Sequence, residues 1–272
     1  MDVLSEVRAF WDRRPCNIRH SPGRVGTREY YDEVEARKYF VEPHIPGFAQ
    51  FEHWRGKKVL EIGCGIGTDA VNFARHGADL TVVELSERTL EVSRRRLEVY
   101  GLTARLCCGN AEQLSTFVPV EPYDLVYSFG VVHHTPHPER VLQEIQKYCK
   151  PETEIRLMVY SRWSWKTFWI ILNYGAGAFW RASELIKRYS EAQTGCPVTW
   201  SYSSHDVRRL MKDYRILEIR KDHIFPYRVQ KYVKYEYEKE WYFRWMSDGL
   251  FRWLERRLGW HTLVTARPKS TR

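Results

Sequence analysis

Short apolar runs alternate with amphipathic stretches along this 272-residue chain. Apolar runs bounded by turn residues are typical of buried strands, whereas apolar residues at helical spacing predict helices. The predicted strands are residues 57–62, 79–84, 123–129, 155–160, 215–220 and 261–266. The predicted helices are 70–76, one that begins at Ser86, 141–148, 207–211 after an N-cap at Ser203, and 248–258. Strands and helices therefore alternate through most of the chain.

The first apolar run ends in an acid and a glycine-rich turn, within Lys57-Lys58-Val59-Leu60-Glu61-Ile62-Gly63-Cys64-Gly65-Ile66-Gly67-Thr68. Glycine permits positive φ and close backbone approach, so this turn can press against a ligand. The dinucleotide fingerprint G-x-G-x-x-G would require a glycine at position 68, where threonine stands. The acid two residues before the first glycine is also foreign to that fingerprint. The spacing therefore disfavours a dinucleotide.

The stretch from Glu61 to Gly67 resembles motif I of the class I S-adenosylmethionine (SAM) dependent methyltransferases. Glu84 ends the next predicted strand, 19 residues after Gly65. A carboxylate at that strand tip is placed to bind a ribose diol, and a helix N-terminal acid is the alternative interpretation. Asn110 stands where the family usually has an acid that contacts adenine. An asparagine can also donate and accept hydrogen bonds there, and a plain turn is the alternative.

Residues 123–134 resemble the fourth strand of this family and the loop beneath the methionine part of SAM, whose end faces the methyl acceptor. Residues 150–153 stand where the family often has Lys-Pro-Gly-Gly, and we interpret them as a turn variant. The resemblance covers roughly residues 55–160. It assigns to the cofactor Glu61, Gly63, Cys64, Gly65, Gly67, Glu84, Leu85, Asn110, Ala111, Glu112, Ser128 and Phe129.

The resemblance implies an α/β fold, a doubly wound and mostly parallel seven-stranded sheet of the Rossmann-like methyltransferase type. SAM would lie across the carboxyl ends of the strands. A chain of this length can hold one such domain with insertions. We divide it into an N-terminal helical lid (1–50), a SAM-binding core (51–160), acceptor-side insertions after the fifth and sixth strands (161–202 and 222–260), and segments that complete the sheet (203–221 and 261–272).

The two insertions are rich in aromatic and basic residues. Residues 151–272 contain 23 basic and 13 acidic residues, whereas residues 1–150 contain 20 and 21. The second part also holds nine of the eleven tryptophans. Basic residues interleaved with aromatic ones suit an anionic substrate, a membrane surface or nucleic acid, and an aromatic core that packs the insertions onto the sheet is the alternative. Arg162 and Trp163, at the start of the first insertion, are candidate substrate contacts.

Methyl transfer from SAM is an in-line displacement, so the protein mainly positions the nucleophile and excludes water. A hydroxyl or protonated amine acceptor also benefits from a general base. His133 and His134 are the candidates, because histidine titrates near neutrality and the resemblance places their loop at the methyl group. Tyr160, at the end of the fifth strand, is a third candidate. A structural role, in which a histidine only binds the loop backbone, is the alternative.

The N-terminal segment supplies further candidates for acceptor contacts. In related enzymes an N-terminal helix closes over SAM, and a tyrosine or arginine on it often contacts cofactor or acceptor. Tyr31 and Arg37 are the residues that this indicates here. Arg19 and His20 are suited to a carboxylate or phosphate of the acceptor, or else to surface ion pairs and turn hydrogen bonds.

Together these features predict a cytoplasmic SAM-dependent methyltransferase of a small, anionic or aromatic molecule, similar to the quinone-biosynthesis type, with S-adenosylhomocysteine (SAH) as product. A tRNA or rRNA methyltransferase is a weaker alternative, because residues 128–131 read Ser-Phe-Gly-Val in place of the Asn/Asp-Pro-Pro-Tyr/Phe signature. Trp241, Trp245, Trp253 and Arg256 indicate a membrane-peripheral lipid or quinone methyltransferase as another. The last alternative is a methyltransferase-like binding protein without activity.

The remaining composition narrows the class of protein. The six cysteines show no C-x-x-C pairing and predict reduced thiols in a cytoplasmic protein. No signal peptide and no uninterrupted apolar run long enough to span a membrane is evident. No H-x-x-x-H pair and no Cys/His cluster with ligand spacing occurs, so we expect no metal site.

Overall fold

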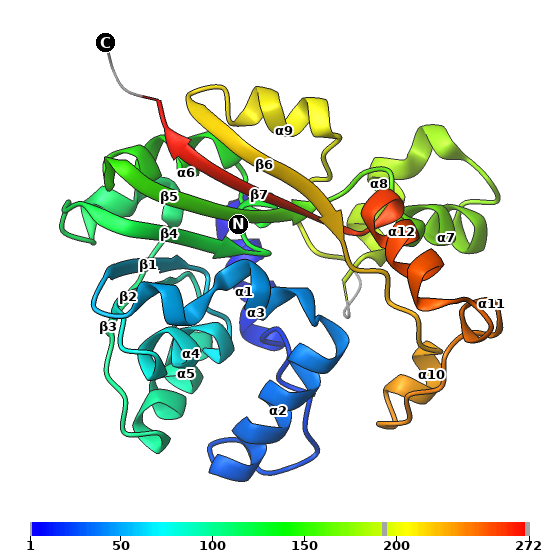
Figure 1. The fold of residues 1–272 in the computed structure, drawn as a ribbon, viewed down its shortest axis with the longest axis horizontal. Coiled ribbons are helices and arrows are strands. Elements are labelled where there is room, and N and C mark those ends of the chain that lie inside the picture. The colour runs from blue at the N-terminus through cyan, green and yellow to red at the C-terminus, as the bar shows by residue number, and fades with distance from the viewer. Residues whose placement is uncertain (1, 192–194, 270–272) are drawn as a thin grey trace.

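The computed structural model describes residues 2–191 and 195–269. Their strands form a seven-stranded sheet in the order β3-β2-β1-β4-β5-β7-β6, in which β7 runs antiparallel to both neighbours and the other pairs are parallel (Figure 1). The strands are β1 (Lys58–Ile62), β2 (Asp79–Glu84), β3 (Arg105–Cys108), β4 (Tyr123–Phe129), β5 (Cys149–Tyr160), β6 (Tyr214–Asp222) and β7 (His261–Pro268). The predicted doubly wound, mostly parallel sheet is confirmed.

The order of the strands reverses between β1 and β4. From β1 the chain runs outward to β2 and β3, then crosses back to β4 on the other side of β1. Loops that leave the carboxyl ends of two such strands diverge and open a crevice between them. The glycine turn follows β1 and residues 130–134 follow β4, so both border the same crevice.

Helices cover the two faces of the sheet, because alternate strand residues point to opposite sides. Val59 packs into a layer formed with α3, η1, α4 and α5. Leu60, its neighbour in β1, packs into the opposite layer with η2, α6 and α9. These helices are α3 (His44–Ala49), η1 (Phe51–Trp54), α4 (Thr68–Arg75), α5 (Glu87–Val99), η2 (Ala111–Thr116), α6 (Pro138–Gln146) and α9 (Ser204–Leu210).

Two of the predictions concern the residues at which a helix or a strand begins. Ser203 caps α9 as expected, in a capping box with Asp206. The turn expected at residues 150–153 is wrong, because β5 begins at Cys149 and includes them. The backbone N–H of Lys150 donates to Thr153 Oγ1 at 2.8 Å, and the pairing register with β4 shifts here. Residues 150–153 therefore form an irregular beginning of β5, although their proline and polar residues are typical of a turn.

Most of the remaining helices belong to the chain ends and the insertions. They are α1 (Val3–Arg13), α2 (Arg28–Val41), η3 (Val132–His134), α7 (Trp165–Tyr174), η4 (Phe179–Arg181), α8 (Ala182–Tyr189), α10 (Val229–Tyr232), α11 (Trp241–Arg244) and α12 (Asp248–Leu258). Helices α7 and α8 follow β5, and α10 to α12 follow β6. They stand together at the right of Figure 1, beyond the carboxyl ends of β4 and β5. No helix of the described residues is long and apolar enough to cross a membrane.

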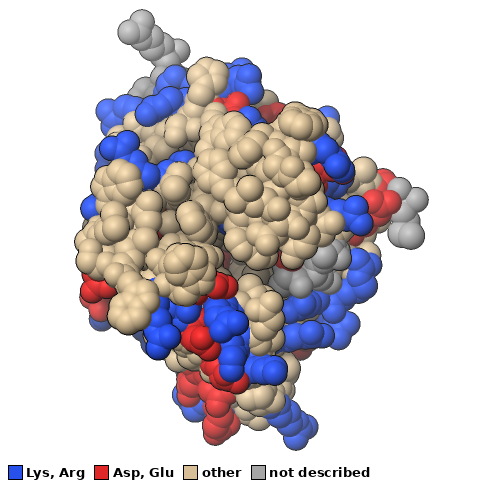
Figure 2. Space-filling view, turned by 90° about the vertical axis from the view of Figure 1, so that its right-hand side faces the viewer, with Lys and Arg blue, Asp and Glu red and all other residues tan. Residues whose placement is uncertain are grey.

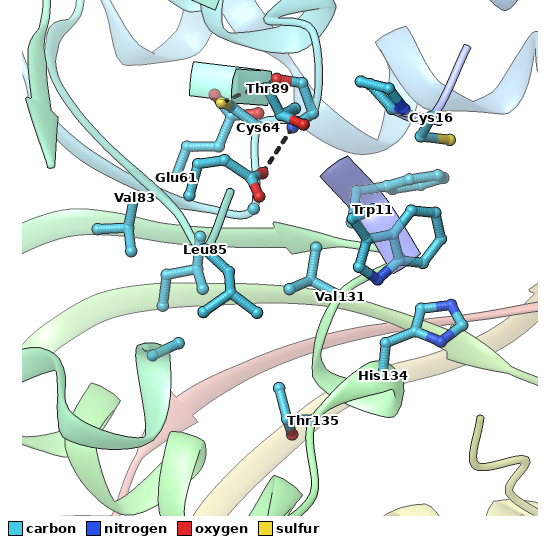
Figure 3. Close-up of a pocket in the computed structure, with 18 of the residues that line it drawn as sticks. Trp11, Cys16, Glu61, Cys64, Val83, Leu85, Thr89, Val131, His134 and Thr135 are labelled. Atoms are coloured by element: carbon cyan, nitrogen blue, oxygen red, sulfur yellow. Dashed lines mark hydrogen bonds between the residues drawn. The ribbon is translucent and has the colours of Figure 1, made fainter. Parts of the chain in front are cut away.

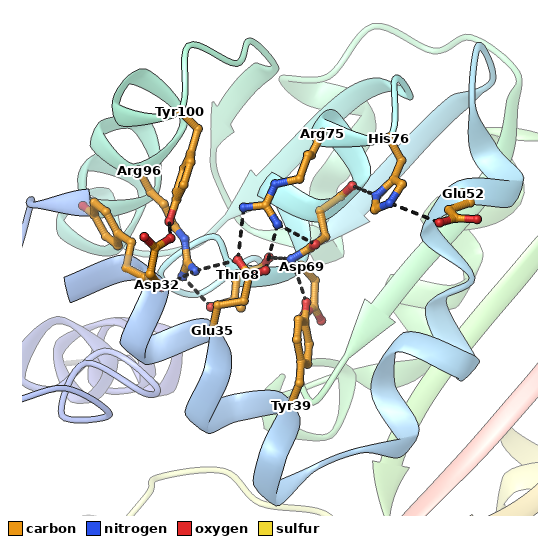
Figure 4. A network of polar contacts seen from close by, with 12 residues as sticks. Asp32, Glu35, Tyr39, Glu52, Thr68, Asp69, Arg75, His76, Arg96 and Tyr100 are labelled. Atoms are coloured by element: carbon orange, nitrogen blue, oxygen red, sulfur yellow. Dashed lines mark hydrogen bonds and ion pairs between the residues drawn. The ribbon is translucent and has the colours of Figure 1, made fainter. Parts of the chain in front are cut away.

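A buried polar network fastens α2 to the core (Figure 4). Arg96 of α5 donates to Thr68 Oγ1 at 2.6 Å and to the backbone oxygen of Tyr31 at 3.0 Å, and it pairs with Glu35. Lys38 of α2 forms an ion pair with Asp69 of α4 at 2.7 Å. Charged groups so deeply buried are stable only when paired. The network therefore fixes the carboxyl end of α2 against the glycine turn.

Candidate active site

A cavity of about 220 Å³ opens at the carboxyl ends of the strands, where the strand order reverses (Figure 3). Glu61 and Cys64, from β1 and the turn after it, lie at one side of the cavity. Trp11 of α1 and His134 of η3 lie at the other. The cavity therefore joins the predicted cofactor loop to the predicted acceptor loop.

The three glycines of the turn are needed for different reasons. All have positive φ, at +80° for Gly63, +53° for Gly65 and +76° for Gly67. A Cβ on Gly63 would lie 2.0 Å from Val131 Cγ2, and one on Gly67 would lie 2.4 Å from Ser93 Oγ. A Cβ on Gly65 would meet nothing closer than 4.0 Å. Gly63 and Gly67 therefore allow close packing, whereas Gly65 presents its backbone to the cavity.

Glu84 lies at the tip of β2 and borders this turn. Its Oε2 accepts the backbone N–H of Gly65 at 3.1 Å, and its Oε1 accepts that of Ser86 at 3.1 Å. Burial raises the pKa of Glu84, although these backbone N–H groups act in the opposite direction. Glu84 thus accepts a hydrogen bond beside the start of α5, as the alternative interpretation expects, and it also borders the cavity, where a ribose contact stays a prediction.

Asn110 and its neighbours border the cavity beyond β3. The Asn110 Oδ1 atom accepts the backbone N–H of Glu112 at 3.0 Å and caps η2. This uses the carbonyl oxygen of the side chain and leaves its amide nitrogen as a donor. Glu112 itself accepts the backbone N–H of His137 at 2.8 Å. Four of the residues assigned to the cofactor line the cavity near here: Leu85, Asn110, Ala111 and Phe129.

Not every residue assigned to the cofactor lines the cavity. Gly67, Glu112 and Ser128 lie outside the lining. The Ser128 hydroxyl donates to the backbone oxygen of Ile62 at 3.1 Å and so joins β4 to β1. These three positions support the turn and the strands that carry the cavity.

A buried carboxyl pair lies beneath the glycine turn. Asp69 accepts from Lys38 at 2.7 Å and from the hydroxyls of Tyr39 and Tyr127, each at 2.9 Å. Glu61 is 2% exposed, and its Oε2 has no hydrogen-bond partner among the described residues. Burial and the nearby Asp69 raise the pKa of Glu61 well above its usual range. The Glu61 carboxyl is therefore the polar group of the cavity that most needs a ligand.

His134 presents one ring nitrogen to the acceptor end of the cavity. Its Nδ1 lies 2.9 Å from the backbone oxygen of Val198. Because a carbonyl only accepts, Nδ1 carries the proton and Nε2 keeps a free lone pair. That Nε2 lies 3.6 Å from a carboxylate oxygen of Glu191, the residue two positions after α8. His134 and Glu191 thus place an imidazole and a carboxylate side by side at this end of the cavity.

His133 and Tyr160 differ in their access to this end. His133 is fully buried, and its ring packs at a tilt of 43° against that of Tyr160, with 3.8 Å between centroids. Burial and the adjacent His134 hold the pKa of His133 well below its usual range. Tyr160 lines the cavity, and burial with nearby Glu191 raises the pKa of its phenol well above the usual range. Of the three candidates, His134 and Tyr160 therefore face the cavity.

The substrate contacts expected from the N-terminal segment lie elsewhere. Tyr31 is buried and donates to the backbone oxygen of Val92 at 3.1 Å. Arg37 donates to the backbone oxygen of Tyr232 at 2.5 Å, and its guanidinium lies over that ring and the ring of Tyr235. His20 Nε2 lies 3.3 Å from the Tyr232 hydroxyl. Tyr31 thus joins α2 to α5, whereas Arg37 and His20 join α2 and the N-terminal segment to the second insertion. All three lie outside the cavity lining.

The other three substrate candidates are also outside the lining. The Arg19 backbone oxygen accepts the hydroxyl of Tyr235, Arg162 pairs with Asp206 at 3.0 Å, and Trp163 is largely exposed. A list of arginines and tyrosines cannot show which face of a helix or loop each one occupies. The structure therefore places all six side chains outside the cavity lining, which disfavours them as acceptor contacts.

Several lining residues had no assignment from the sequence. They are Trp11, Cys16, Asn17, Lys38, Glu42, Asp69, Glu191 and His261. Trp11 ends the apolar face of α1, which includes the buried Val7 and Phe10 and is visible as an amphipathic pattern. Helix α1 thus covers the cavity, and only the carboxyl end of α2 reaches it.

Comparison with known proteins agrees with this geometry. The profile of a methyltransferase domain matches residues 59–152, which run from β1 into β5. Residues 59–152 are a methyltransferase domain. The ubiquinone biosynthesis O-methyltransferase of Azoarcus sp. (strain BH72) is 33% identical over 96 residues, which are 35% of this chain and 41% of that protein. The enzyme of the same name from Idiomarina loihiensis is 32% identical over 116 residues, or 43% and 45%.

The fold of the methyltransferase domain and its surroundings is also found in solved structures. Magnesium protoporphyrin IX methyltransferase from Synechocystis PCC 6803 with bound SAH superposes with a TM-score of 0.59 at 14% identity, over 98% of this chain and all of that one. The putative methyltransferase bound to the Trm112 activator in Haloferax volcanii gives 0.57 at 14%, over 97% and 98%. The fold is that of the class I SAM-dependent methyltransferases. The chain spans less than half the length of the curated relatives it matches.

Proposed function

We propose that this chain is an enzyme that transfers a methyl group from SAM to a small-molecule acceptor. One observation carries the proposal: Glu84 at the tip of β2, the backbone of Gly65 and the free nitrogen of His134 all border one cavity. The methyltransferase domain and the fold support the same reaction type. The relatives align over less than half of their length, so the acceptor is argued from the cavity itself.

The groups of the cavity fit SAM at three points. Glu84 has lone pairs beyond those that accept Gly65 and Ser86, and these suit a ribose diol. Asn110 has a free amide nitrogen, which suits a ring nitrogen of adenine. Glu61 has a buried oxygen without a partner among the described residues, which suits the methionine ammonium group.

When bound, SAM supplies a methyl group that its sulfonium has already activated. Transfer forms a bond between the acceptor heteroatom and the methyl carbon, breaks the methyl–sulfur bond, and releases SAH. An acceptor hydroxyl also loses its proton, and His134 Nε2 is placed to take it. Glu191, 3.6 Å away, stabilises the imidazolium that results. Trp11 packs edge-on against His134, with 5.1 Å between ring centroids, and excludes water from this end.

The lining favours an aromatic acceptor and constrains its charge. Trp11, Phe129 and Tyr160 supply aromatic surface at the acceptor end. Five carboxyl residues border the cavity, namely Glu42, Glu61, Asp69, Glu84 and Glu191. Lys38 also borders it, and its ammonium group forms an ion pair with Asp69. One cation of residues 151–272 lies beside this lining: Lys166 Nζ is 5.8 Å from the ring centroid of Tyr160 and donates to the backbone oxygen of Ser190 at 2.7 Å. An anionic acceptor would need another cation in the cavity to balance these acids.

Calorimetry with SAH and a transfer assay with labelled SAM test the proposal. We expect SAH binding with one site per chain, and label transfer to aromatic hydroxyl compounds that His134→Ala abolishes. The exposed His137→Ala is the matched control, because His137 lies in a turn outside the lining. A chain that gives no heat with either SAM or SAH would overturn the proposal.

A peripheral membrane location is a second proposal, carried by the face that the insertions present. Figure 2 shows a broad area without charged side chains on this side of the molecule, with lysines and arginines at its margins. Trp180 and Trp245 are each 86% exposed and Trp241 is 74% exposed. Exposed tryptophans beside basic residues suit the interface of an anionic bilayer. The acceptor would then be a lipid-soluble aromatic such as a quinone precursor.

Vesicle flotation tests this location. We expect the full chain to float with phosphatidylcholine vesicles that contain phosphatidylserine, and the double variant Trp180→Ala, Trp245→Ala to remain in solution. The Val120→Ala variant removes an exposed apolar side chain from a loop outside the insertions and should float like the wild type. Equal flotation of all three variants would contradict the proposal. A cytoplasmic location is proposed in addition, because all six cysteines are free thiols.

A further inference from the structure

Three histidines and a glutamate meet at the acceptor end of the cavity, from separate parts of the chain. Glu42 ends α2, His44 begins α3, His223 follows β6 and His261 begins β7. His223 and His261 are buried, the side chain of His44 is 5% exposed, and Glu42 and His261 line the cavity. No step of the proposed methyl transfer uses them. These side chains are of the types that bind metal ions, and the proposed reaction does not account for their proximity.

The ligand atoms of Glu42, His223 and His261 are close enough to share one ion. One atom from each lies within 4.8 Å of the others. Glu42 Oε1 lies 3.7 Å from His261 Nε2, and the rings of His223 and His261 stack with 4.6 Å between centroids. Ligand atoms around a tetrahedral zinc ion lie about 3.3 Å apart, since each is bound at about 2.0 Å. Small side-chain rotations therefore convert the cluster into a coordination shell.

His44 supplies an independent observation, because it orients His261. Its Nε2 lies 3.0 Å from His261 Nδ1. Its own Nδ1 is buried without a hydrogen-bond partner among the described residues and faces the Asp222 carboxylate at 4.0 Å. A proton on His44 Nδ1 makes its Nε2 an acceptor, so that His261 donates from Nδ1. The lone pair of His261 Nε2 is then directed to Glu42, as in histidines that bind metals.

His223 is also held in place with its ring uncommitted. Its backbone adopts a φ of +70°, and its N–H donates to the Asp222 side chain at 2.9 Å. Neither ring nitrogen of His223 has a hydrogen bond to another described residue, although the ring is packed between those of His44 and His261. The ring nitrogens of His223 are therefore available to a ligand.

We propose that Glu42, His223 and His261 bind one divalent transition-metal ion at the acceptor end of the cavity. Two imidazoles and one carboxylate are typical ligands of zinc and of ferrous iron, and they leave coordination positions open. Because Glu42 and His261 line the cavity, the open positions face the space beside Tyr160 and Phe129. The ion also adds positive charge beside the five carboxyl residues of the lining.

The role of the ion rests on the proposed function. An acceptor with two adjacent oxygen donors, such as a catechol or a hydroxy acid, would bind to the open positions. This binding orients the hydroxyl and favours its ionised form, whose lone pair then receives the methyl group. The released proton goes to solvent or to His134. The expected acceptor is therefore a molecule that chelates the ion through two oxygen atoms.

Metal binding can be tested without any acceptor. The full chain is stripped with EDTA and titrated with Co²⁺, and the visible absorption of a nitrogen- and oxygen-ligated site is followed. Zn²⁺ is then added as competitor. We expect one equivalent of Co²⁺ per chain, a rise in melting temperature on binding, and at least about tenfold weaker binding in Glu42→Gln and in His223→Gln. The matched controls are the exposed Glu152→Gln and His205→Gln, which should bind as the wild type does.

The alternative is a cluster that only joins α2, β6 and β7 through packing. In that case His223→Gln lowers the melting temperature, while Co²⁺ and Zn²⁺ leave the melting temperature of the wild type unchanged. That outcome overturns the proposal, as does Co²⁺ binding that neither Glu42→Gln nor His223→Gln weakens. SAH titration of the same samples separates the two proposals: Co²⁺ binding without SAH binding would leave the metal site standing and overturn the methyltransferase.

Discussion

The Glu84 carboxylate accepts the backbone N–H of Gly65 at 3.1 Å, and so ties the tip of β2 to the glycine turn after β1. One side chain thereby holds the turn and borders the cavity. We expect Glu84→Ala to weaken SAH binding by about 10- to 100-fold, because hydrogen bonds to a charged group contribute about 1.5–3 kcal/mol. Calorimetry measures this, with the exposed Glu87→Ala as control. Equal affinities in both variants would refute a ribose contact.

His134 and His133 are adjacent, yet only His134 borders the cavity. We expect His134→Ala to lower kcat by about 10²–10⁴-fold, the usual contribution of a general base. SAH affinity should stay within a few fold, because the ring lies at the acceptor end. Glu191→Gln should lower kcat less, since it removes the partner charge and keeps the base. Rates measured with saturating SAM check this, and a fully active His134→Ala variant would exclude the base.

Alanine substitutions at Gly63 and Gly101 distinguish the free-energy cost of a steric clash from that of backbone strain. Both have positive φ, +80° and +66°, but a Cβ on Gly101 meets nothing within 4 Å, whereas one on Gly63 lies 2.0 Å from Val131. Alanine at either site costs about 1–2 kcal/mol in the left-handed region. We expect Gly63→Ala to cost a further 1–3 kcal/mol, roughly the usual effect of overpacking. Urea unfolding measures both, and equal losses would contradict the packing role.

The buried Glu61 makes the free energy of unfolding depend on pH. Its pKa is raised in the folded protein, mainly by burial and then by Asp69. Above the pKa of the unfolded chain, near 4.5, unfolding releases a proton from this group. The stability it contributes is therefore full at low pH and is lost as the pH rises through the folded pKa. Between about pH 5 and pH 8, we expect the free energy of unfolding to fall less in Glu61→Gln than in the wild type.

Urea midpoints for both proteins at the two pH values provide the measurement. Glu84, whose pKa is also raised, titrates in both proteins and cancels from the comparison. Parallel pH profiles would show that Glu61 is ionised in the folded state, and that Lys38 compensates its charge.

Arg37 serves as a structural link in this fold. Its guanidinium lies 4.0 Å from the ring centroid of Tyr232 and 4.2 Å from that of Tyr235, in the second insertion. We expect Arg37→Ala to lower the free energy of unfolding by about 2–3 kcal/mol, through lost cation–π and hydrogen-bond contacts. KM for the acceptor should not change. The exposed Arg88→Ala is the control, and a raised KM in Arg37→Ala would restore the substrate contact that the sequence suggested.

Local spacing let the sequence identify the cofactor side of the cavity. Glu61, Gly63 and Gly65 follow one strand, and Glu84 ends the next, so strand geometry alone brings them to one edge of the sheet. The acceptor side depends on helix faces and on which loop covers which strand. Tyr31 and Arg37 therefore turned out to be packing residues, and Trp11 and Glu191 received no assignment.

The sequence by itself determined the class of fold and the glycine turn at the edge of the sheet, because each depends on residues that are neighbours along the chain or along adjacent strands. Only the tertiary structure decided that Glu42, His223 and His261 share one site, and that His134 rather than His133 faces the cavity. These relationships arise where β7 enters between β5 and β6 and where α2 docks on α4. Long-range packing of this kind leaves no periodic signal in the order of the residues.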